Sequence, residues 1–211
     1  MGSMLQQRSL THMPIRSPNV TELPPLSPTL ETLRQHVLEH SVKHGEFVLK
    51  SGATSTWFLD TKQTACRADG ILAVTDALIE VFGADLDGID AIGGLTMGAD
   101  PLAYGVAAVL ATRGSRLRSF SVRKEPKAGG ITGRIAGALQ PGDRVLVTED
   151  TTTRGTSLVE AAEQIAEFGA EPVLMSVIVD RGGTCAAMAA DRNIDYRALL
   201  TAPDLGFGFG T

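Results

Sequence analysis

Short apolar runs alternate with longer amphipathic stretches along most of this chain. The uninterrupted apolar run Val145 to Val147 predicts a buried parallel strand. The stretch that follows predicts a helix over residues 156–168, because its apolar side chains fall on one stripe. These are Leu158, Ala161, Ala162, Ile165 and Phe168. A strand followed directly by an amphipathic helix is the basic unit of an α/β protein.

The same alternation predicts the other elements of the domain. Strands are expected near residues 89–92, 117–122, 144–148, 172–179 and 196–200, and helices at 67–82, 100–112 and 183–192. Ser27 and Pro28 predict the start of an earlier helix that ends near Gly45. Residues 46–49 and 56–59 then predict a hairpin, and residues 123–137 show no periodicity. We expect a mainly parallel sheet flanked by helices, with a small N-terminal hood of helix and hairpin.

Composition refines this picture. The chain has 211 residues, 43% of them hydrophobic, which is enough to bury one good core, so we expect one domain over residues 29–211. Residues 1–28 hold five prolines and little periodicity, and we expect a disordered N-terminal lead.

Charge and cysteine content exclude several classes of protein. A net charge of −5 argues against a surface that mainly binds nucleic acid. No apolar stretch approaches the ~20 residues that a bilayer-spanning helix needs. Cys66 and Cys185 lie far apart without a Cys-x-x-Cys spacing, which favours a reduced, cytoplasmic compartment.

The strand at 144–148 runs into the most informative segment of the chain. It ends in two carboxylates, Glu149 and Asp150, and a loop from Thr151 to Ser157 with five hydroxyl side chains follows. The loop lies at the start of a helix, where amides and hydroxyls bind phosphate. Acids at the end of a strand accept hydrogen bonds from a ribose diol. Helix capping alone is the alternative, but one capping residue would suffice for that.

Two further segments suit an anionic ligand. Arg123, Lys124 and Lys127 place three cations within five residues, just before Gly129 and Gly130. Such cations balance the charge of a departing pyrophosphate, and the glycines suit a closing loop. A solvated basic loop is the plainer interpretation. The run from Gly93 to Pro101 is also glycine-rich, so its backbone amides can approach an anion.

The remaining candidates are a lysine, an aromatic residue and an arginine. Lys50, in the predicted hairpin turn, and Phe58 suit a planar anionic base. Arg181 follows the strand at 172–179, and its guanidinium fork suits a carboxylate. A core position for Phe58, a solvated Lys50 and an ordinary surface turn at Arg181 are equally open on these residues alone.

The segments Gly93 to Pro101, Val122 to Lys127, Glu149 to Gly155 and Val179 to Arg181 occur in an order that resembles the type I phosphoribosyltransferases. Together with Leu49 to Gly52 and Trp57 to Asp60, they resemble the orotate phosphoribosyltransferases, especially those of actinobacteria. The resemblance covers about residue 30 to the end. It implies transfer of a phosphoribosyl group from phosphoribosyl pyrophosphate (PRPP) to orotate with Mg²⁺. It also implies a homodimer in which one subunit's basic loop closes over the other's site.

The resemblance also implies a role for each candidate. Lys127 would be the main catalytic cation, with Arg123 and Lys124 beside it on pyrophosphate. Ribose and the 5′-phosphate would be held by Glu149, Asp150, Thr151, Thr152, Thr153, Arg154, Gly155, Thr156 and Ser157. Orotate would be held by Lys50, Phe58, Thr153 and Arg181, with Lys50 also reaching PRPP. No residue would bind the metal directly, since PRPP would carry the Mg²⁺.

Three positions depart from the family pattern. Gly129 stands where the family has a histidine, and Arg154 stands where a small residue is usual. Gly98 holds a place that is often lysine, as in the actinobacterial branch. These departures leave two alternatives open, which are a phosphoribosyltransferase for another base and a non-catalytic protein that senses PRPP or nucleotides.

A histidine series in the first predicted helix raises the question of a second metal site. His36, His40 and His44 are spaced one helical turn apart. Their helix face carries no acidic or cysteine ligand, so we expect no metal there.

Overall fold

The computed structural model describes residues 23–48, 54–127 and 133–210. Its first half contains α1 (Pro28–His40), β1 (Val42–Val48), β2 (Thr54–Leu59), α2 (Lys62–Ala65), α3 (Ala68–Phe82), a 3-10 turn (Gly83–Gly88), β3 (Ala91–Leu95) and α4 (Ala99–Thr112). The second half contains β4 (Arg118–Lys127), β5 (Gly133–Gly137), β6 (Arg144–Thr152), α5 (Thr156–Phe168), β7 (Glu171–Asp180), α6 (Cys185–Ala190), β8 (Asp195–Tyr196), β9 (Leu200–Thr201) and a final 3-10 turn (Pro203–Leu205).

The central sheet has seven strands in the order β5-β4-β3-β6-β7-β8, and β9 also pairs with β7. Every pairing in it is parallel except β4 with β5, which is antiparallel. The chain crosses over between β3 and β4 through α4, and between β6 and β7 through α5. The prediction of an α/β fold with a mainly parallel sheet is therefore confirmed.

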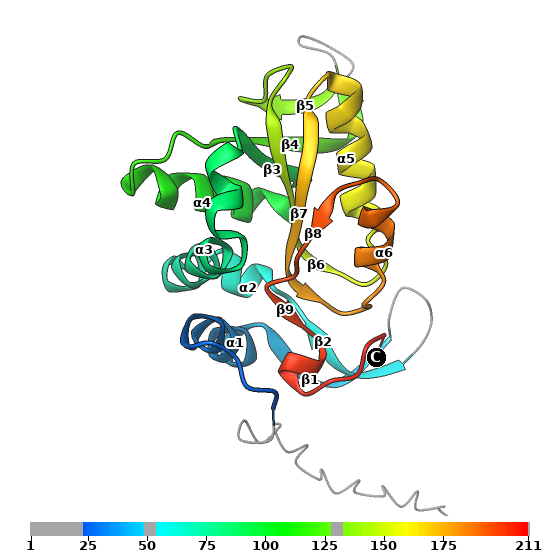
Figure 1. Ribbon diagram of the computed structural model, residues 1–211. Coiled ribbons are helices and arrows are strands. Elements are labelled where there is room, and N and C mark those ends of the chain that lie inside the picture. Colours follow the sequence, from blue (N-terminus) through cyan, green and yellow to red (C-terminus); the bar gives the residue numbers. More distant parts are fainter. Residues whose placement is uncertain (1–22, 49–53, 128–132, 211) are drawn as a thin grey trace, which may run out of the picture.

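Helices cover both faces of the central sheet (Figure 1), and the sheet separates two apolar cores. One core joins α1, α3 and α4 to side chains such as Ile92 and Leu146 on one face. The other joins α5 and α6 to Phe120 and Val147 on the opposite face. Four of the five residues of the predicted α5 stripe are buried, whereas Phe168 at the end of that helix is exposed.

The predicted hood is a helix and a hairpin at one end of the sheet (Figure 1). β1 and β2 pair antiparallel, with Val42 opposite Leu59, and the turn between them lies outside the described residues. α1 begins at Pro28 with Ser27 as its cap, as predicted, but it ends at His40 rather than near Gly45. The chain turns into β1 there because the Asp60 amide hydrogen-bonds to the Ser41 carbonyl, which draws the chain toward β2.

The segment just before α1 packs on the hood. The Pro24 carbonyl accepts a hydrogen bond from Arg34, and Leu26 packs against the core. The rest of the predicted disordered lead, residues 1–22, lies outside the described residues.

Residues 123–127 and 133–137, which show no periodicity in the sequence, are strands in the structure: β4 continues to Lys127 and pairs with β5, so the two strands form a β-ribbon at the edge of the sheet. The glycines of the predicted closing loop lie outside the described residues. The predicted last strand at 196–200 is wrong, because two short strands, β8 and β9, replace it along the edge of β7. Across the described parts of the chain, no helix is both long and apolar enough to cross a bilayer.

Candidate functional site

The acid pair lies at the carboxyl end of β6, in the middle of the sheet. Glu149 and Asp150 are 7% and 4% exposed, so both carboxyl groups are removed from bulk water. Burial, and then the charge of Asp150, raise the pKa of Glu149 to about 8. At neutral pH a protonated Glu149 can donate a hydrogen bond as well as accept one. Such a pair suits a vicinal diol, whose hydroxyls also both donate and accept.

A lysine that was not a candidate in the sequence contacts the acid pair. Lys62, in the short helix α2, donates a 2.6 Å hydrogen bond to Asp150 Oδ2. Burial lowers the pKa of Lys62, but the hydrogen bond and charge of Asp150 outweigh it, so that the pKa is raised. Lys62 lies three residues after the predicted strand at 56–59. It belongs to the site only because the fold brings α2 close enough to the end of β6 for Lys62 to contact Asp150.

The glycine-rich turn between β3 and α4 lies directly against the two acids. A Cβ atom on Gly98 would lie 1.7 Å from Glu149 Oε1 and 2.6 Å from Asp150 Oδ1. Only a residue without a side chain can occupy this position while the acids keep their orientation. The structure thus brings together two segments that are 50 residues apart in sequence.

The hydroxyl loop divides into two parts. Thr151 and Thr152 belong to β6, and their hydroxyls already serve the fold: Thr151 donates to the Val179 carbonyl at 3.0 Å, and Thr152 accepts from the Gly155 amide at 2.8 Å. Thr153 and Thr156 are exposed. Arg154 is also exposed, and Thr151 and Ser157 are partly exposed. The open part of the loop therefore surrounds the N-terminus of α5, where backbone N–H groups and the helix dipole favour an anion.

A second turn, after β7, closes against this loop. Asp180 is buried, and its Oδ1 accepts the amides of Gly182 and Gly183, both at 2.9 Å. The Arg181 amide donates to the Thr152 carbonyl at 2.8 Å, and a Cβ on Gly182 would lie 1.6 Å from the Thr153 carbonyl oxygen. These contacts place Arg181 beside the hydroxyl loop.

The side chain of Arg181 packs against Trp57 of β2, which is itself stacked on Phe207 near the end of the chain. Its guanidinium carbon lies 4.5 Å from the ring centroid of Trp57, and burial lowers the pKa of Arg181. Trp57 in turn stacks on Phe207, with centroids 3.8 Å apart and planes at 5°. Sequence reasoning noted Trp57 only as a motif residue and missed Phe207. The alternation of buried and exposed residues in β2 appears only in the structure, because Trp57, Phe58 and Leu59 are consecutive apolar residues in the sequence.

Phe58 lies on the opposite face of β2 from Trp57. It is 38% exposed, and its ring centroid is 5.5 Å from that of Phe47. The prediction that Phe58 stacks on a base therefore requires the base to approach the Phe58 side of the hairpin. Lys50, in the turn of that hairpin, lies outside the described residues.

The predicted basic loop is the β4–β5 ribbon. Arg123 is partly buried and Lys124 exposed, and Arg134 of β5 donates to the Arg123 carbonyl at 2.6 Å. The backbone of Lys127 pairs with Gly133, while Gly129 and Gly130 lie outside the described residues. β4 and β6 both flank β3, so the cations and the acid pair leave the same edge of the sheet two strands apart.

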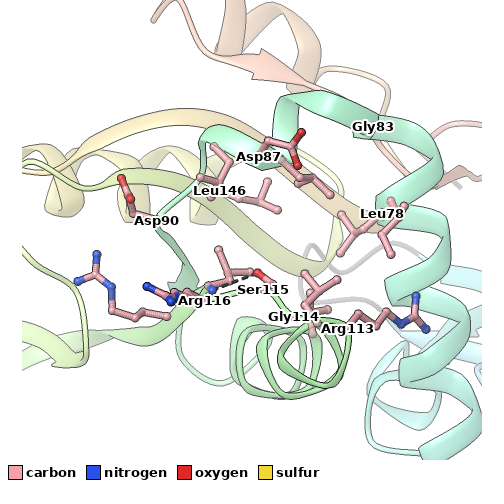
Figure 2. Close-up of a pocket in the computed structure, with 16 residues that line it drawn as sticks. Leu78, Gly83, Asp87, Asp90, Arg113, Gly114, Ser115, Arg116 and Leu146 are labelled. Carbon is pink, nitrogen blue, oxygen red and sulfur yellow. Dashed lines mark hydrogen bonds between the residues drawn. The ribbon is translucent and has the colours of Figure 1, made fainter.

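A cavity of about 650 Å³ lies at the opposite, amino edge of the sheet (Figure 2). Leu78 and Leu146 contribute to its apolar lining, with Asp90 and Arg113 on different sides of it. Arg113 is ion-paired with Asp76 at 2.6 Å. None of the residues predicted to bind a ligand lines this cavity.

Comparison with known proteins identifies relatives of the chain. No family model matches the sequence. An orotate phosphoribosyltransferase of Streptomyces avermitilis is 39% identical over 175 residues, which are 82% of this chain and 95% of the relative. One of Corynebacterium glutamicum (strain R) is 38% identical over 174 residues, 82% of this chain and 92% of the relative.

Solved structures agree with these relatives. The crystal structure of a phosphoribosyltransferase from Corynebacterium diphtheriae has a TM-score of 0.74 at 35% identity, covering 86% of this chain and all of that one. The orotate phosphoribosyltransferase of Mycobacterium tuberculosis H37Rv in complex with PRPP has a TM-score of 0.71 at 30% identity, covering 85% and 100%.

The sheet order, the buried acid pair and these structural neighbours define a phosphoribosyltransferase of the type I fold. This is a class of pentosyltransferases. Within the class, identities near 40% over most of the chain are decisive: the chain belongs to the orotate phosphoribosyltransferase family.

Proposed function

We propose that this protein transfers the 5-phosphoribosyl group of PRPP to N1 of orotate. The products are orotidine 5′-monophosphate and pyrophosphate, as in the de novo synthesis of UMP. One observation carries the proposal: a buried acid pair leads into a hydroxyl loop at the N-terminus of α5, in a chain of this family.

The phosphoribosyl half of PRPP fits the end of β6 and the start of α5. Glu149 and Asp150 would receive the ribose hydroxyls, with Lys62 holding Asp150 in position. The open hydroxyls of Thr153, Thr156 and Ser157, together with the loop amides up to Gly155, would bind the 5′-phosphate. Thr151 and Thr152 would support this loop through the hydrogen bonds that fix it to the sheet. Arg154 is exposed at the rim and adds a positive charge there.

The leaving pyrophosphate defines the role of the basic ribbon. As the bond from the anomeric carbon to pyrophosphate oxygen breaks, its electron pair leaves with the pyrophosphate. N1 of orotate supplies the electron pair of the new bond, and the N1 proton is released to water. Arg123, Lys124 and Lys127 would stabilise this growing negative charge more strongly in the transition state than before it.

Orotate would bind between the turn after β7 and the hood. Arg181 would receive its carboxylate, and Trp57 restricts the guanidinium from behind. Thr153 and Lys50 would line the remainder of this base site. Phe58 lies on the opposite face of β2 from Trp57, so it would stack on the base only where the base extends to that side of the hairpin. Desolvation of the half-buried Arg181 strengthens its preference for an anionic partner, since an ion pair offsets the cost of burial.

Mg²⁺ suits this site as an ion carried by PRPP. Asp150 is already engaged by Lys62, and Glu149 has a raised pKa that favours its neutral form, so neither carboxylate is free to be a strong metal ligand. They would instead hold ribose hydroxyls that ligate the ion. Mg²⁺ would supply charge neutralisation to the pyrophosphate.

We further propose a cytoplasmic homodimer in which the ribbon of one subunit acts at its neighbour's site. Mixing an inactive Lys127→Ala variant with an inactive Asp150→Asn variant tests this arrangement. Random exchange of subunits would create dimers with one intact site, and activity would recover to about a quarter of the wild-type value. Activity that stays at the level of the separate variants would place both residues in one subunit's site.

The decisive experiment measures orotate loss by its ultraviolet absorbance in the presence of PRPP and Mg²⁺. Consumption of orotate with formation of pyrophosphate is expected. If a different base is consumed and orotate is not, the protein is a phosphoribosyltransferase for that base, and Gly129 and Arg154 are the positions to which we would attribute the change in specificity. PRPP binding without consumption of any base would assign the protein to a sensing role.

A further inference from the structure

Two histidines and an aspartate meet between α1 and α3, away from the acid pair. His36 and His40 lie one turn apart on α1, and Asp69 lies in the first turn of α3. Their potential ligand atoms all lie within 4.8 Å of one another. His44, the third member of the histidine series, is in β1 near Phe207 and takes no part. The expectation of no acidic ligand was therefore incomplete, because Asp69 comes from a different helix.

His36 is held in the manner of a metal ligand. Its side chain is only 10% exposed, and its Nδ1 lies 3.1 Å from the Thr64 hydroxyl, which is itself 2.7 Å from the Ser41 hydroxyl. Ligating histidines commonly use the second ring nitrogen in this way, which fixes the tautomer and the orientation of the ring. The hydroxyl pair of Thr64 and Ser41 would then be the outer shell of the site.

The other ring nitrogen of His36 is buried toward Asp69. Among the described residues, Nε2 makes no hydrogen bond, yet it lies 3.3 Å from Asp69 Oδ1. Either ring nitrogen can carry the proton: on Nε2 it would face Asp69, and on Nδ1 it would face Thr64. In the second tautomer, the Nε2 lone pair and the carboxylate oxygen would both face a cation placed between them.

The spacing of these two atoms fits a specific class of cation. Two ligands that are each about 2.0–2.1 Å from Zn²⁺ at a tetrahedral angle stand about 3.3 Å apart. The side chains of His40 and Asp69 are 24% and 75% exposed, so both have room to rotate toward a shared ion. Imidazole and carboxylate ligands suit zinc and similar transition metals, whereas Mg²⁺ prefers oxygen ligands and water.

We propose that His36, His40 and Asp69 form a binding site for Zn²⁺ or a similar divalent transition metal. Water would complete the coordination. The ion would fasten α1, and with it the hood, to α3.

Calorimetry with ZnCl₂ alone, without PRPP, tests this site on the full-length protein. A Cys66→Ser background removes the exposed thiol as a competing ligand. One equivalent of Zn²⁺ should bind, an excess of Mg²⁺ should leave that binding in place, and Co²⁺ should give the visible absorption of a tetrahedral site. Loss of an outer-shell partner alone typically weakens metal affinity about 10–100-fold, so His40→Gln and Asp69→Asn should each weaken it at least about tenfold.

His44→Gln is the matched control, because it removes an exposed histidine from the same part of the chain. It should leave Zn²⁺ affinity unchanged. The proposal is overturned if the parent protein gives neither heat nor a Co²⁺ spectrum, or if His44→Gln weakens binding as much as His40→Gln. Asp69 is highly exposed, so Asp69→Asn tests the site with little risk to folding. None of these readouts depends on orotate turnover.

Discussion

The two edges of the central sheet differ in how their charges are arranged. At the amino edge, two of the three arginines that line the cavity of Figure 2 are ion-paired: Arg113 pairs with Asp76, and Arg118 pairs with Asp143, both at 2.6 Å. At the carboxyl edge, two carboxyl groups are buried side by side, and the pKa of Glu149 is raised to about 8. The size of a cavity is therefore a poor guide to the ligand-binding site, whereas buried groups with perturbed pKa values indicate one.

The difference has a physical origin in the parallel arrangement of β3, β6 and β7. Their carboxyl ends and the helix N-termini that follow meet at one edge, so N–H groups and loop side chains converge there. At the other edge the chain arrives from helix C-termini, and Arg113, Arg118 and Arg144 are used in ion pairs there. Variants matched between the two edges test this contrast.

The largest effect is expected for Lys127→Ala. If the charge acts mainly on the departing pyrophosphate, kcat should fall about a hundred-fold or more, while PRPP affinity falls less. Arg116→Ala, an exposed cation at the amino-edge cavity, is the matched control and should keep wild-type kinetics. Steady-state kinetics and PRPP titration measure both quantities. Reduced affinity with an unchanged kcat would exclude a transition-state role for Lys127.

A smaller loss is expected for Asp150→Asn. The amide keeps the shape of the side chain but removes the charge that Lys62 and a ribose hydroxyl would share, and a hydrogen bond to a charged group contributes about 1.5–3 kcal/mol. PRPP affinity should therefore fall about 10–100-fold in calorimetry. Asp87→Asn at the amino-edge cavity should have no effect. Identical titrations of the Asp150→Asn variant and the wild type would remove Asp150 from the ribose site.

Gly98→Ala should give a further, more moderate effect. The added methyl would displace the Glu149 and Asp150 carboxylates, and overpacking of this kind costs about 1–3 kcal/mol. We expect PRPP to bind about tenfold more weakly. Gly88→Ala is the control, because the nearest atom to its new Cβ is Arg144 Nε at 3.8 Å. If Gly98→Ala and Gly88→Ala bind PRPP equally well, the close approach of Gly98 to the two acids does not contribute to PRPP binding.

The smallest effect concerns stability and pH. Because the pKa of Glu149 lies near 8 in the folded state, against 4.5 ordinarily, the folded protein holds this proton more tightly than the unfolded chain. The resulting stabilisation is complete below about pH 4.5 and is lost as the pH rises through about 8. This stabilisation is at most about 1.4 kcal/mol for each unit by which the pKa of Glu149 differs between the folded and unfolded states.

Urea unfolding at pH 5 and pH 8 measures this contribution. Glu149→Gln cannot titrate, so its free energy of unfolding should fall less between the two pH values than that of the wild type. The exposed Glu167 provides a control variant, Glu167→Gln, which should behave as the wild type. An equal fall in all three proteins would show that Glu149 is not the group responsible.

The sequence was a good guide where a periodic apolar pattern coincides with a buried face. Helix α5 runs over residues 156–168 as predicted, because its stripe packs on the sheet and Gly155 and Gly169 bound it in left-handed conformations. β5 was missed because it is an edge strand of partly exposed residues without alternation. The end of α1 was misplaced because a bond from distant Asp60 determines it.

The candidate site shows the same division. Glu149, Asp150 and the loop that follows are contiguous, so one motif revealed them. The glycine-rich run Gly93 to Pro101 was a candidate, but its contact with the two acids through Gly98 follows from the pairing of β3 with β6. Lys62 was not a candidate, because its hydrogen bond to Asp150 joins residues far apart in the sequence that no local pattern connects. Thr152 was predicted to bind the ligand, and in the structure its hydroxyl accepts a hydrogen bond from the Gly155 amide. The sequence does not show this contact.

The stack of Phe207 on Trp57 links the last residues of the chain to the guanidinium at position 181. A protein shortened just before Phe207 would leave one indole face bare and remove the ring that supports Trp57 against Arg181. Trimming that tail to aid crystallisation would thus alter the proposed base site, although no predicted ligand contact would have been deleted.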